Sequence, residues 1–224
     1  MRKSDPILMA AKDAFIENGF GNSSMDDIAV RAATTKRTVY NNFGSKEQLL
    51  EAVIDHSIAL FEESVPTLDP APSAAQLDIN QISRFCELLL QLMTWRAAIG
   101  LQRLIIAEGL AFPHLAERLA TRISAAMCQP LSALFKARGL SAALAQKHAV
   151  VTVDMLTSKA RLDRLLGLRQ AYPALPGKNR LDATDRAAIE AALKYLLDQA
   201  APMRRASTTL GKATSRASKV DNCS

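Results

Sequence analysis

Two helix-start signals lie within residues 24–50, and they constrain the fold more than any other feature of the chain. Ser24 precedes an apolar-periodic run, and Asp27 follows it at the spacing of a capping box. A hydroxyl at such a position accepts a hydrogen bond from a backbone N–H that has no partner within the helix. The pattern therefore predicts a short helix over about residues 25–32.

A second short helix is predicted after a turn at residues 33–34, with Thr35 as its cap and Gly44 at its end. Val39 and Phe43 have the i, i+4 spacing that puts two side chains on one buried face. A helix this short is not stable alone, so it needs a partner to pack against. The opposite face is polar and carries Lys36, Arg37, Thr38, Tyr40 and Asn41.

This layout is typical of a helix-turn-helix, whose second helix lies in the DNA major groove. Basic side chains at the helix start suit phosphates or guanine edges, the amide of Asn41 or Asn42 suits an adenine edge, and hydroxyls suit phosphate oxygens. Lys46 lies within a second capping box, Ser45 to Gln48, and it is expected to hold another phosphate. The alternative is a solvated polar helix inside an all-helical protein, but two capping boxes with a matching turn favour the DNA reader.

Residues 5–55 resemble the DNA-binding domain of the TetR (tetracycline-repressor-like) family. The matching segments are Asn18-Gly19-Phe20, the helix from Ser24 to Ala32, and the run from Thr35 to Leu49. The resemblance implies DNA contacts by Thr35, Lys36, Arg37, Thr38, Tyr40, Asn41 and Lys46. Two departures are visible: Ala33 and Thr34 stand where the family often has Gly and a β-branched residue, and Asn41 replaces a common His or Arg.

Composition predicts an all-α fold with no membrane span, because 49% of the residues are apolar, Ala and Leu are abundant, and no long apolar run lacks charge. The N-terminus shows no signal-peptide core, so we expect a cytoplasmic protein. The three cysteines, Cys86, Cys128 and Cys223, show no paired-ligand spacing. They are expected to be reduced thiols, with a redox-sensing pair as the alternative. His56, His114 and His148 lie far apart, so neither a metal nor a cofactor is predicted.

The formal net charge of +6 does not locate a nucleic-acid surface. Residues 1–50 and 51–201 each carry +1, and residues 202–224 carry +4. The local placement of basic side chains, including Arg2 and Lys3 before the first helix, is therefore more informative than the total.

Three regions are predicted: a helix-turn-helix domain at 1–50, a helical ligand-binding and dimerisation domain at 51–201, and a basic, disordered tail at 202–224. A helix from Ser45 to about Ser64 connects the first two, and a Pro-rich loop follows at 65–76. Pro130 is expected to break or kink a helix that opens at Pro113. Two long helices are predicted at about 142–168 and 183–201.

Residues 80–170 resemble, more loosely, the C-terminal domain of an efflux-associated (AefR-like) branch of the TetR family, on Arg103 to Glu108 and Phe112 to Leu115. This resemblance implies a ligand-binding domain whose last two helices form a four-helix interface in a homodimer. Extra apolar residues on these helices agree with that, and burial within the monomer is the alternative.

A ligand pocket is expected in this part of the chain, apolar with a few orienting polar groups. The candidates for its wall are Phe85, Met93, Trp95, Phe112, His114, Met127 and Met155, with Arg96, Arg103 and Glu108 as possible polar groups. An aromatic or Met residue at helical spacing is more often part of the core, so the residues alone do not decide between these roles.

Taken together, the sequence predicts a homodimeric, ligand-responsive transcriptional regulator, a repressor that binds double-stranded DNA at a pseudo-palindrome and is released by a small apolar effector. One alternative is a helical enzyme, although no phosphate-cradling loop, nucleophile elbow or catalytic cluster is visible. The other is a DNA-binding protein without an effector.

Overall fold

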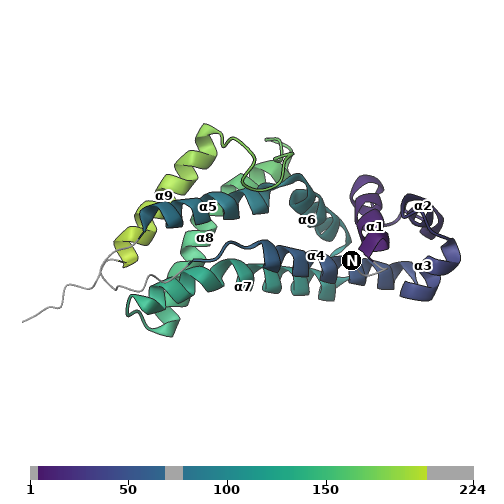
Figure 1. Cartoon of the computed structure of the whole chain (residues 1–224), viewed down its shortest axis with the longest axis horizontal. Coiled ribbons are helices and arrows are strands. Elements are labelled where there is room, and N and C mark those ends of the chain that lie inside the picture. Colours follow the sequence, from purple (N-terminus) through teal and green to yellow (C-terminus); the bar gives the residue numbers. More distant parts are fainter. Residues whose placement is uncertain (1–4, 69–77, 201–224) are drawn as a thin grey trace, which may run out of the picture.

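The computed structural model describes residues 5–68 and 78–200, and these residues are almost entirely helical (Figure 1). The all-α prediction is therefore confirmed. The described helices are α1 (Asp5–Asn18), α2 (Met25–Arg31), α3 (Lys36–Phe43), α4 (Lys46–Ser64), α5 (Ile79–Thr94), α6 (Arg96–Glu108), α7 (Pro113–Ala137), α8 (Ala142–Leu165) and α9 (Ala183–Ala200).

Helices α1, α2 and α3 pack together at one end of the molecule (Figure 1). Their shared core contains Phe15, Ile28 and Val39, each no more than 1% exposed. The same apolar cluster includes Leu104 of α6 and Leu115 of α7. The core of the N-terminal end therefore continues past residue 50 into helices of the second half of the chain.

Helix α4 leads away from this end and lies beside α7 (Figure 1). Three pairs of side chains follow the contact, in the same order along both helices, so that the two helices run parallel; two are ion pairs of arginine, and one joins a carboxylate to a histidine. The pairs are Glu51 with His114, Asp55 with Arg118, and Glu62 with Arg122. We call these six residues the α4–α7 ladder.

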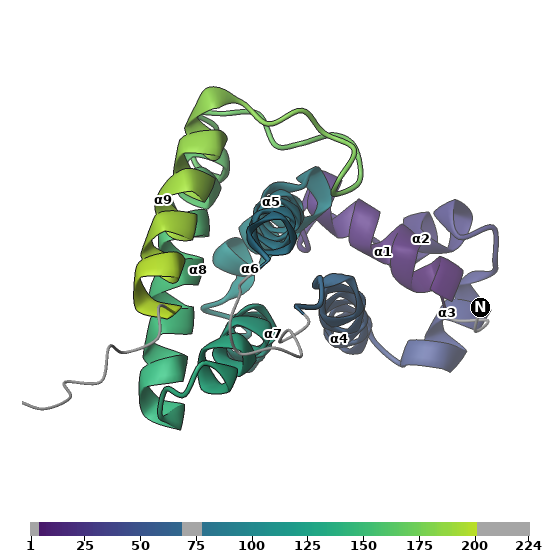
Figure 2. The same ribbon diagram turned by 60° about the vertical axis from the view of Figure 1, so that its left-hand side comes forward.

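Helices α8 and α9 lie side by side at the opposite end from α1–α3 (Figure 2). The second large core cluster joins them to α5 and α7 through side chains such as Phe85, Phe135, Leu156 and Leu196, all no more than 1% exposed. Helix α5 is therefore apolar on the surfaces that meet its neighbours, which is why its sequence is rich in Leu.

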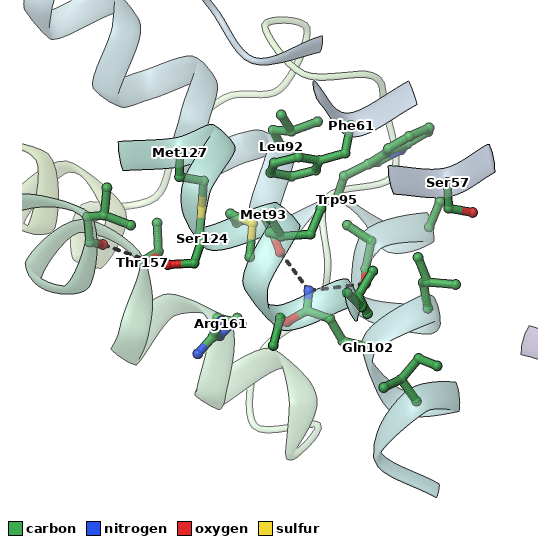
Figure 3. Close-up of a pocket in the computed structure, with 18 of the residues that line it drawn as sticks. Ser57, Phe61, Leu92, Met93, Trp95, Gln102, Ser124, Met127, Thr157 and Arg161 are labelled. Carbon is green, nitrogen blue, oxygen red and sulfur yellow. Dashed lines mark hydrogen bonds between the residues drawn. The ribbon is translucent and has the colours of Figure 1, made fainter. Parts of the chain in front are cut away.

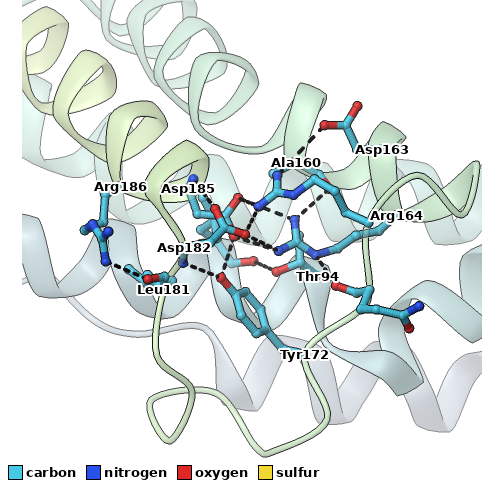
Figure 4. A network of polar contacts seen from close by, with 12 residues as sticks. Thr94, Ala160, Asp163, Arg164, Tyr172, Leu181, Asp182, Asp185 and Arg186 are labelled. Atoms are coloured by element: carbon cyan, nitrogen blue, oxygen red, sulfur yellow. Dashed lines mark hydrogen bonds and ion pairs between the residues drawn. The ribbon is translucent and has the colours of Figure 1, made fainter.

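A buried polar network ties α8 to the start of α9 (Figure 4). The guanidinium of Arg164, 1% exposed, donates to the carboxylate of Asp185 at 2.7 Å. The hydroxyl of Tyr172 donates to the same carboxylate at 2.6 Å, and its ring lies 4.7 Å from the Arg164 guanidinium. The backbone of Tyr172 also pairs with Thr94 and Arg96, which fastens the α8–α9 connection to the α5–α6 junction.

Two details differ from the sequence-based expectations. Pro130 lies inside α7 and does not break it, because Met127, Leu131 and Leu134 are buried on both sides of the proline and their packing offsets the lost hydrogen bond. Helix α8 ends at Leu165, three residues before the expected end, where Gly167 adopts a φ of 77°. The predicted loop at 65–76 and the tail at 202–224 lie largely or wholly outside the described residues.

Across residues 5–68 and 78–200, no helix combines the length and the hydropathy that crossing a membrane would require.

Candidate DNA-binding face and ligand cavity

The three predicted helix caps are present. Ser24 Oγ accepts from the backbone N–H of Asp27, Thr35 Oγ1 accepts from that of Thr38, and Ser45 Oγ accepts from that of Gln48, each at 3.1 Å. These bonds satisfy N–H groups at the starts of α2, α3 and α4 and so define where each helix begins.

The turn between α2 and α3 uses a left-handed residue. Ala33 has a φ of 50°. Among the described residues that are not glycine, it is the one with a positive φ. The turn is closed by the N–H groups of Ala32 and Thr34, which donate to Ile28 and Ala29. An alanine therefore occupies a conformation that glycine adopts with less steric cost.

One face of α3 is open to solvent. Lys36, Arg37, Tyr40 and Asn41 are exposed, together with the cap Thr35, while Val39 on the other face is fully buried. Thr38 is half-buried, and its hydroxyl lies 2.8 Å from that of Thr35. The exposed set is the one that the sequence predicts for base and phosphate contacts.

Lys36 has a partner within the motif. Its ammonium lies 3.0 Å from the carboxylate of Asp26 on α2 and 5.9 Å from the ring centroid of Tyr40. The hydrogen bond to Asp26 raises the pKa of Lys36. Both side chains are exposed, so this ion pair can exchange for a phosphate.

Lys46 is held differently from the other predicted DNA contacts. Its ammonium donates to the carbonyls of Phe20, Gly21 and Ser23 at 3.0, 3.3 and 3.1 Å, and it lies 4.5 Å from the ring centroid of Phe20. The structure therefore gives Lys46 the role of fastening the α1–α2 connection to the start of α4. Its contact with phosphate stays a prediction.

A cavity of about 490 Å³ lies between the helices of the second half of the chain (Figure 3). Helices α4, α6, α7 and α8 form most of its wall, and Lys12 of α1 also reaches it. Most of the wall is apolar. The lining residues with larger or polar side chains include Ser57, Phe61, Leu92, Met93, Trp95, Gln102, Leu119, Ile123, Ser124, Met127, Asp154, Thr157 and Arg161.

Three of the predicted pocket residues, Met93, Trp95 and Met127, line this cavity. The other four lie elsewhere: Phe85 in the core around α5, Phe112 against the ring of Phe20, His114 in the α4–α7 ladder, and Met155 exposed on α8. Of the predicted polar groups, Arg103 donates to the carbonyls of Arg164 and Leu165 at the end of α8. Arg96 and Glu108 are not among the lining residues.

Sequence reasoning missed Phe61, Gln102 and Arg161 as cavity residues. The periodicity of α8 contains a signal for the last of these, because Val150, Val153, Thr157 and Arg161 recur at helical spacing and share one face. Asp154 also lines the cavity from α8, so this helix brings two charged side chains to the wall.

The thiols show no sign of activation. Burial raises the pKa of Cys86 to about 12, and burial also raises that of Cys128, which lines the cavity. Cys223 lies outside the described residues. Within the described ranges, no group of three or more His, Cys, Asp or Glu side chains is arranged to hold a metal ion.

Two family models match the chain. The model of bacterial regulatory proteins of the tetR family matches residues 7–53, and that of the C-terminal domain of AefR-like transcriptional repressors matches residues 80–194, about half of the chain. The first match contains the caps and α3, and the second contains most of the cavity wall.

Relatives with curated descriptions match part of the chain. An HTH-type transcriptional repressor of Mycobacterium tuberculosis is 46% identical over 50 residues, which is 22% of this chain and 27% of the relative. The regulator UidR of Escherichia coli is 31% identical over 120 residues, which is 50% of this chain and 55% of UidR. The chain thus spans about a quarter of the first relative and about half of the second.

Solved structures share the fold over most of the chain. A TetR-family regulator from Mesorhizobium loti superposes with a TM-score of 0.72 at 23% identity, covering 88% of this chain and 96% of that one. FrrA, described as a flavonoid-responsive regulator, superposes with a TM-score of 0.64 at 26% identity over the same shares. With the match over residues 80–194, these findings show that the chain belongs to the TetR family of bacterial regulatory proteins.

Proposed function

We propose that the chain is a ligand-responsive transcriptional repressor that binds a pseudo-palindromic operator as a homodimer and is released by a small, largely apolar molecule. The observation that carries this proposal is the position of α4. This helix follows directly on α3, which presents the exposed polar face, and it also contributes Phe61 and Ser57 to the wall of the cavity.

DNA binding is assigned to α3 and its cap. In this proposal the helix lies in the major groove, where Arg37 and Asn41 face base edges and Tyr40 contacts the phosphate backbone. The exposure of these three side chains and the burial of Val39 behind them support the assignment. Lys36 exchanges its ion pair with Asp26 for a phosphate.

Dimerisation is assigned to α8 and α9, which lie at the end of the molecule opposite α3 (Figure 2). Helix α8 and its C-cap residue Leu166 expose apolar side chains: Leu144, Met155, Leu162 and Leu166 have 42%, 41%, 54% and 65% of their surfaces accessible. These apolar side chains lie on a helix face with no neighbour in the protomer, and a second copy would cover them. A dimer built there would place its two α3 helices on successive turns of the groove.

The effector is assigned to the cavity between α4, α6, α7 and α8. A molecule that fits one conformation of these helices better than another shifts the population toward that conformation. Because α4 lines the cavity and connects to α3, the shift changes the separation of the two recognition helices. The apolar wall suits a largely apolar ligand, and the similarity to the flavonoid-responsive FrrA supports a small organic effector.

This function requires binding and no chemical step, so we infer that the chain is not an enzyme. No cofactor is part of the proposed mechanism, and its place of action is the cytoplasm, where the operator DNA lies.

The proposal is tested by gel shift on the DNA that flanks the chain's own gene, at low and moderate salt. We expect a specific shift and an affinity that falls as the salt concentration rises, because contacts with DNA phosphates release the counterions bound to the DNA. Absence of any specific shift at low salt would overturn the proposal. Arg37→Ala is expected to relax preference at one base position, whereas Tyr40→Phe is expected to weaken binding to all sequences alike.

A further inference from the structure

We propose that the molecule bound in the cavity is an organic acid, an aromatic or aliphatic body with one anionic group, and that Arg161 of α8 binds this group. The inference rests on the proposed function of the cavity as the effector site, and it specifies the chemistry of the ligand.

Arg161 is half-buried in the cavity wall (Figure 3). Among the described residues, its guanidinium makes neither an ion pair nor a hydrogen bond, whereas Arg164, less than one turn further along α8, pairs with Asp185. Its nitrogens keep some contact with solvent, and a carboxylate or sulfonate in the cavity would replace that water with two parallel, charge-assisted hydrogen bonds. Arg161 is therefore a donor that is ready for an anionic ligand.

Other polar groups of the wall are already committed to the protein. Thr157 donates to the carbonyl of Val153 at 2.9 Å, and Ser57 donates to that of Val53 at 2.7 Å. The amide of Gln102 donates to the carbonyls of Met93 and Ala98, at 3.4 and 3.1 Å. These three side chains thus donate to backbone carbonyls, whereas the guanidinium of Arg161 has no such acceptor among the described residues.

The charges around the cavity also favour an anion. Besides Arg161, the lining residues include Lys12, whose side chain is 13% exposed and whose ammonium lies 3.7 Å from the sulfur of Met9 and 4.0 Å from the carboxylate of Asp13. The opposing charge is that of Asp154, which is exposed and solvated. The lining thus includes two basic residues and one acidic residue.

The rest of the cavity wall indicates the size and the chemistry of the part of the ligand that carries no charge. Trp95, Phe61, Met93 and Met127 offer aromatic and polarisable surface, and the volume of about 490 Å³ suits a molecule of one to three rings. A hydrophobic acid satisfies both parts of the site, while a neutral hydrocarbon leaves Arg161 without a partner.

The test uses two dyes with the same aromatic skeleton. 8-Anilino-1-naphthalenesulfonate is an anion, and N-phenyl-1-naphthylamine is its neutral counterpart. Trp95 is the only tryptophan of the chain and lines the cavity, so energy transfer from Trp95 to a dye reports binding there. With the full chain, we expect the anionic dye to bind more tightly than the neutral dye.

Arg161→Gln is expected to lower the affinity for the anionic dye at least tenfold, because a charge-assisted hydrogen bond is lost. The affinity for the neutral dye should change by less than twofold. Arg180→Gln is the matched control, because Arg180 is exposed and outside the cavity wall. Arg161→Lys keeps the positive charge, so this variant is expected to retain most of the preference for the anionic dye. Such retention would show that the effect of Arg161→Gln comes from the lost charge and not from poor folding.

Equal affinity of the wild type for both dyes, or equal weakening of both dyes by Arg161→Gln with native helicity by circular dichroism, would overturn the assignment to an acid. A neutral dye that binds at Trp95 in that case would leave the cavity as the effector site. If neither dye receives energy from Trp95, the cavity binds no ligand of this size, and the effector part of the proposed function fails as well. The gel shift measures the DNA-binding part separately.

Discussion

The guanidinium of Arg118 on α7 donates to both carboxylate oxygens of Asp55 on α4, at 2.9 and 3.0 Å. This ion pair is the middle rung of the α4–α7 ladder, which connects the helix that follows α3 to a wall of the cavity. Arg118 also lies in the field of Glu51, and Arg122 in that of Asp55, so each arginine is attracted to the carboxylate of the preceding rung. The ladder therefore holds α4 against α7 with charges at the surface.

Removing the middle rung is expected to have a small effect that depends on salt. Arg118→Gln should lower Tm by about 1–3 °C at low ionic strength, since exposed ion pairs contribute little. The difference in Tm between the wild type and Arg118→Gln should disappear in 1 M salt, where the Debye length falls to about 3 Å. Glu117→Gln, a neighbouring exposed change outside the ladder, is the control. A loss that persists in 1 M salt would mean that Arg118 acts through packing.

Ala33→Gly is expected to stabilise the protein by about 0.5–1 kcal/mol. The left-handed conformation costs an alanine more than it costs a glycine, and this gain exceeds the added entropy of glycine in the unfolded chain. Urea denaturation followed by circular dichroism measures the change. Ala32→Gly serves as the counterpart, because Ala32 has a φ of −82° and gains nothing from glycine, so it should be destabilising. A destabilised Ala33→Gly protein would contradict the turn as described.

Asp185→Asn is expected to destabilise the protein by about 3–5 kcal/mol, because it removes the buried carboxylate that pairs with the guanidinium of Arg164 at 2.7 Å and leaves only Asp182, 3.9 Å away. Both side chains are at most 1% exposed, and the change also weakens the hydrogen bond from Tyr172 (Figure 4). Equilibrium unfolding in urea gives the free energy. Lys159→Gln, which removes the exposed partner of Asp163, should change stability little. Similar stability of the two variants would show that the buried pair is dispensable.

Tyr172 is expected to make stability depend on pH in the alkaline range. Burial, and then the hydrogen bond to Asp185, raise the pKa of Tyr172 from 10.0 to about 12. Since the folded state holds the proton more tightly, its contribution is complete below pH 10 and is lost as the pH rises toward 12. The difference in unfolding free energy between the wild type and Tyr172→Phe should therefore narrow across this window. A difference that stays constant from pH 9 to pH 11.5 would argue against the buried hydrogen bond.

Helix starts could be predicted because a cap is a local interaction. Ser24, Thr35 and Ser45 each accept a hydrogen bond from the backbone N–H three residues later, so the two residues of each bond lie within one short segment of the sequence. The exposed face of α3 could be predicted for the same reason, since helical spacing separates Val39 from Arg37 and Tyr40.

Lys46 and Phe85 show where local reasoning stops. Lys46 donates to carbonyls that lie 23 to 26 residues earlier in the chain. Phe85 packs in the core around α5, although Leu92, two helical turns later on the same helix, lines the cavity. Spacing tells which residues share a face, but it does not tell which neighbour that face meets.

The sequence by itself determined the helix-turn-helix, the all-α class and the family, because caps, periodicity and an ordered motif are properties of short segments. Only the tertiary structure decided which side chains line the cavity, that Arg161 lacks a partner within the described part of the chain while Arg164 has one, and that α7 continues through Pro130. These outcomes depend on how helices far apart in the chain pack together, and packing energy from many residues can outweigh the preference of any single one.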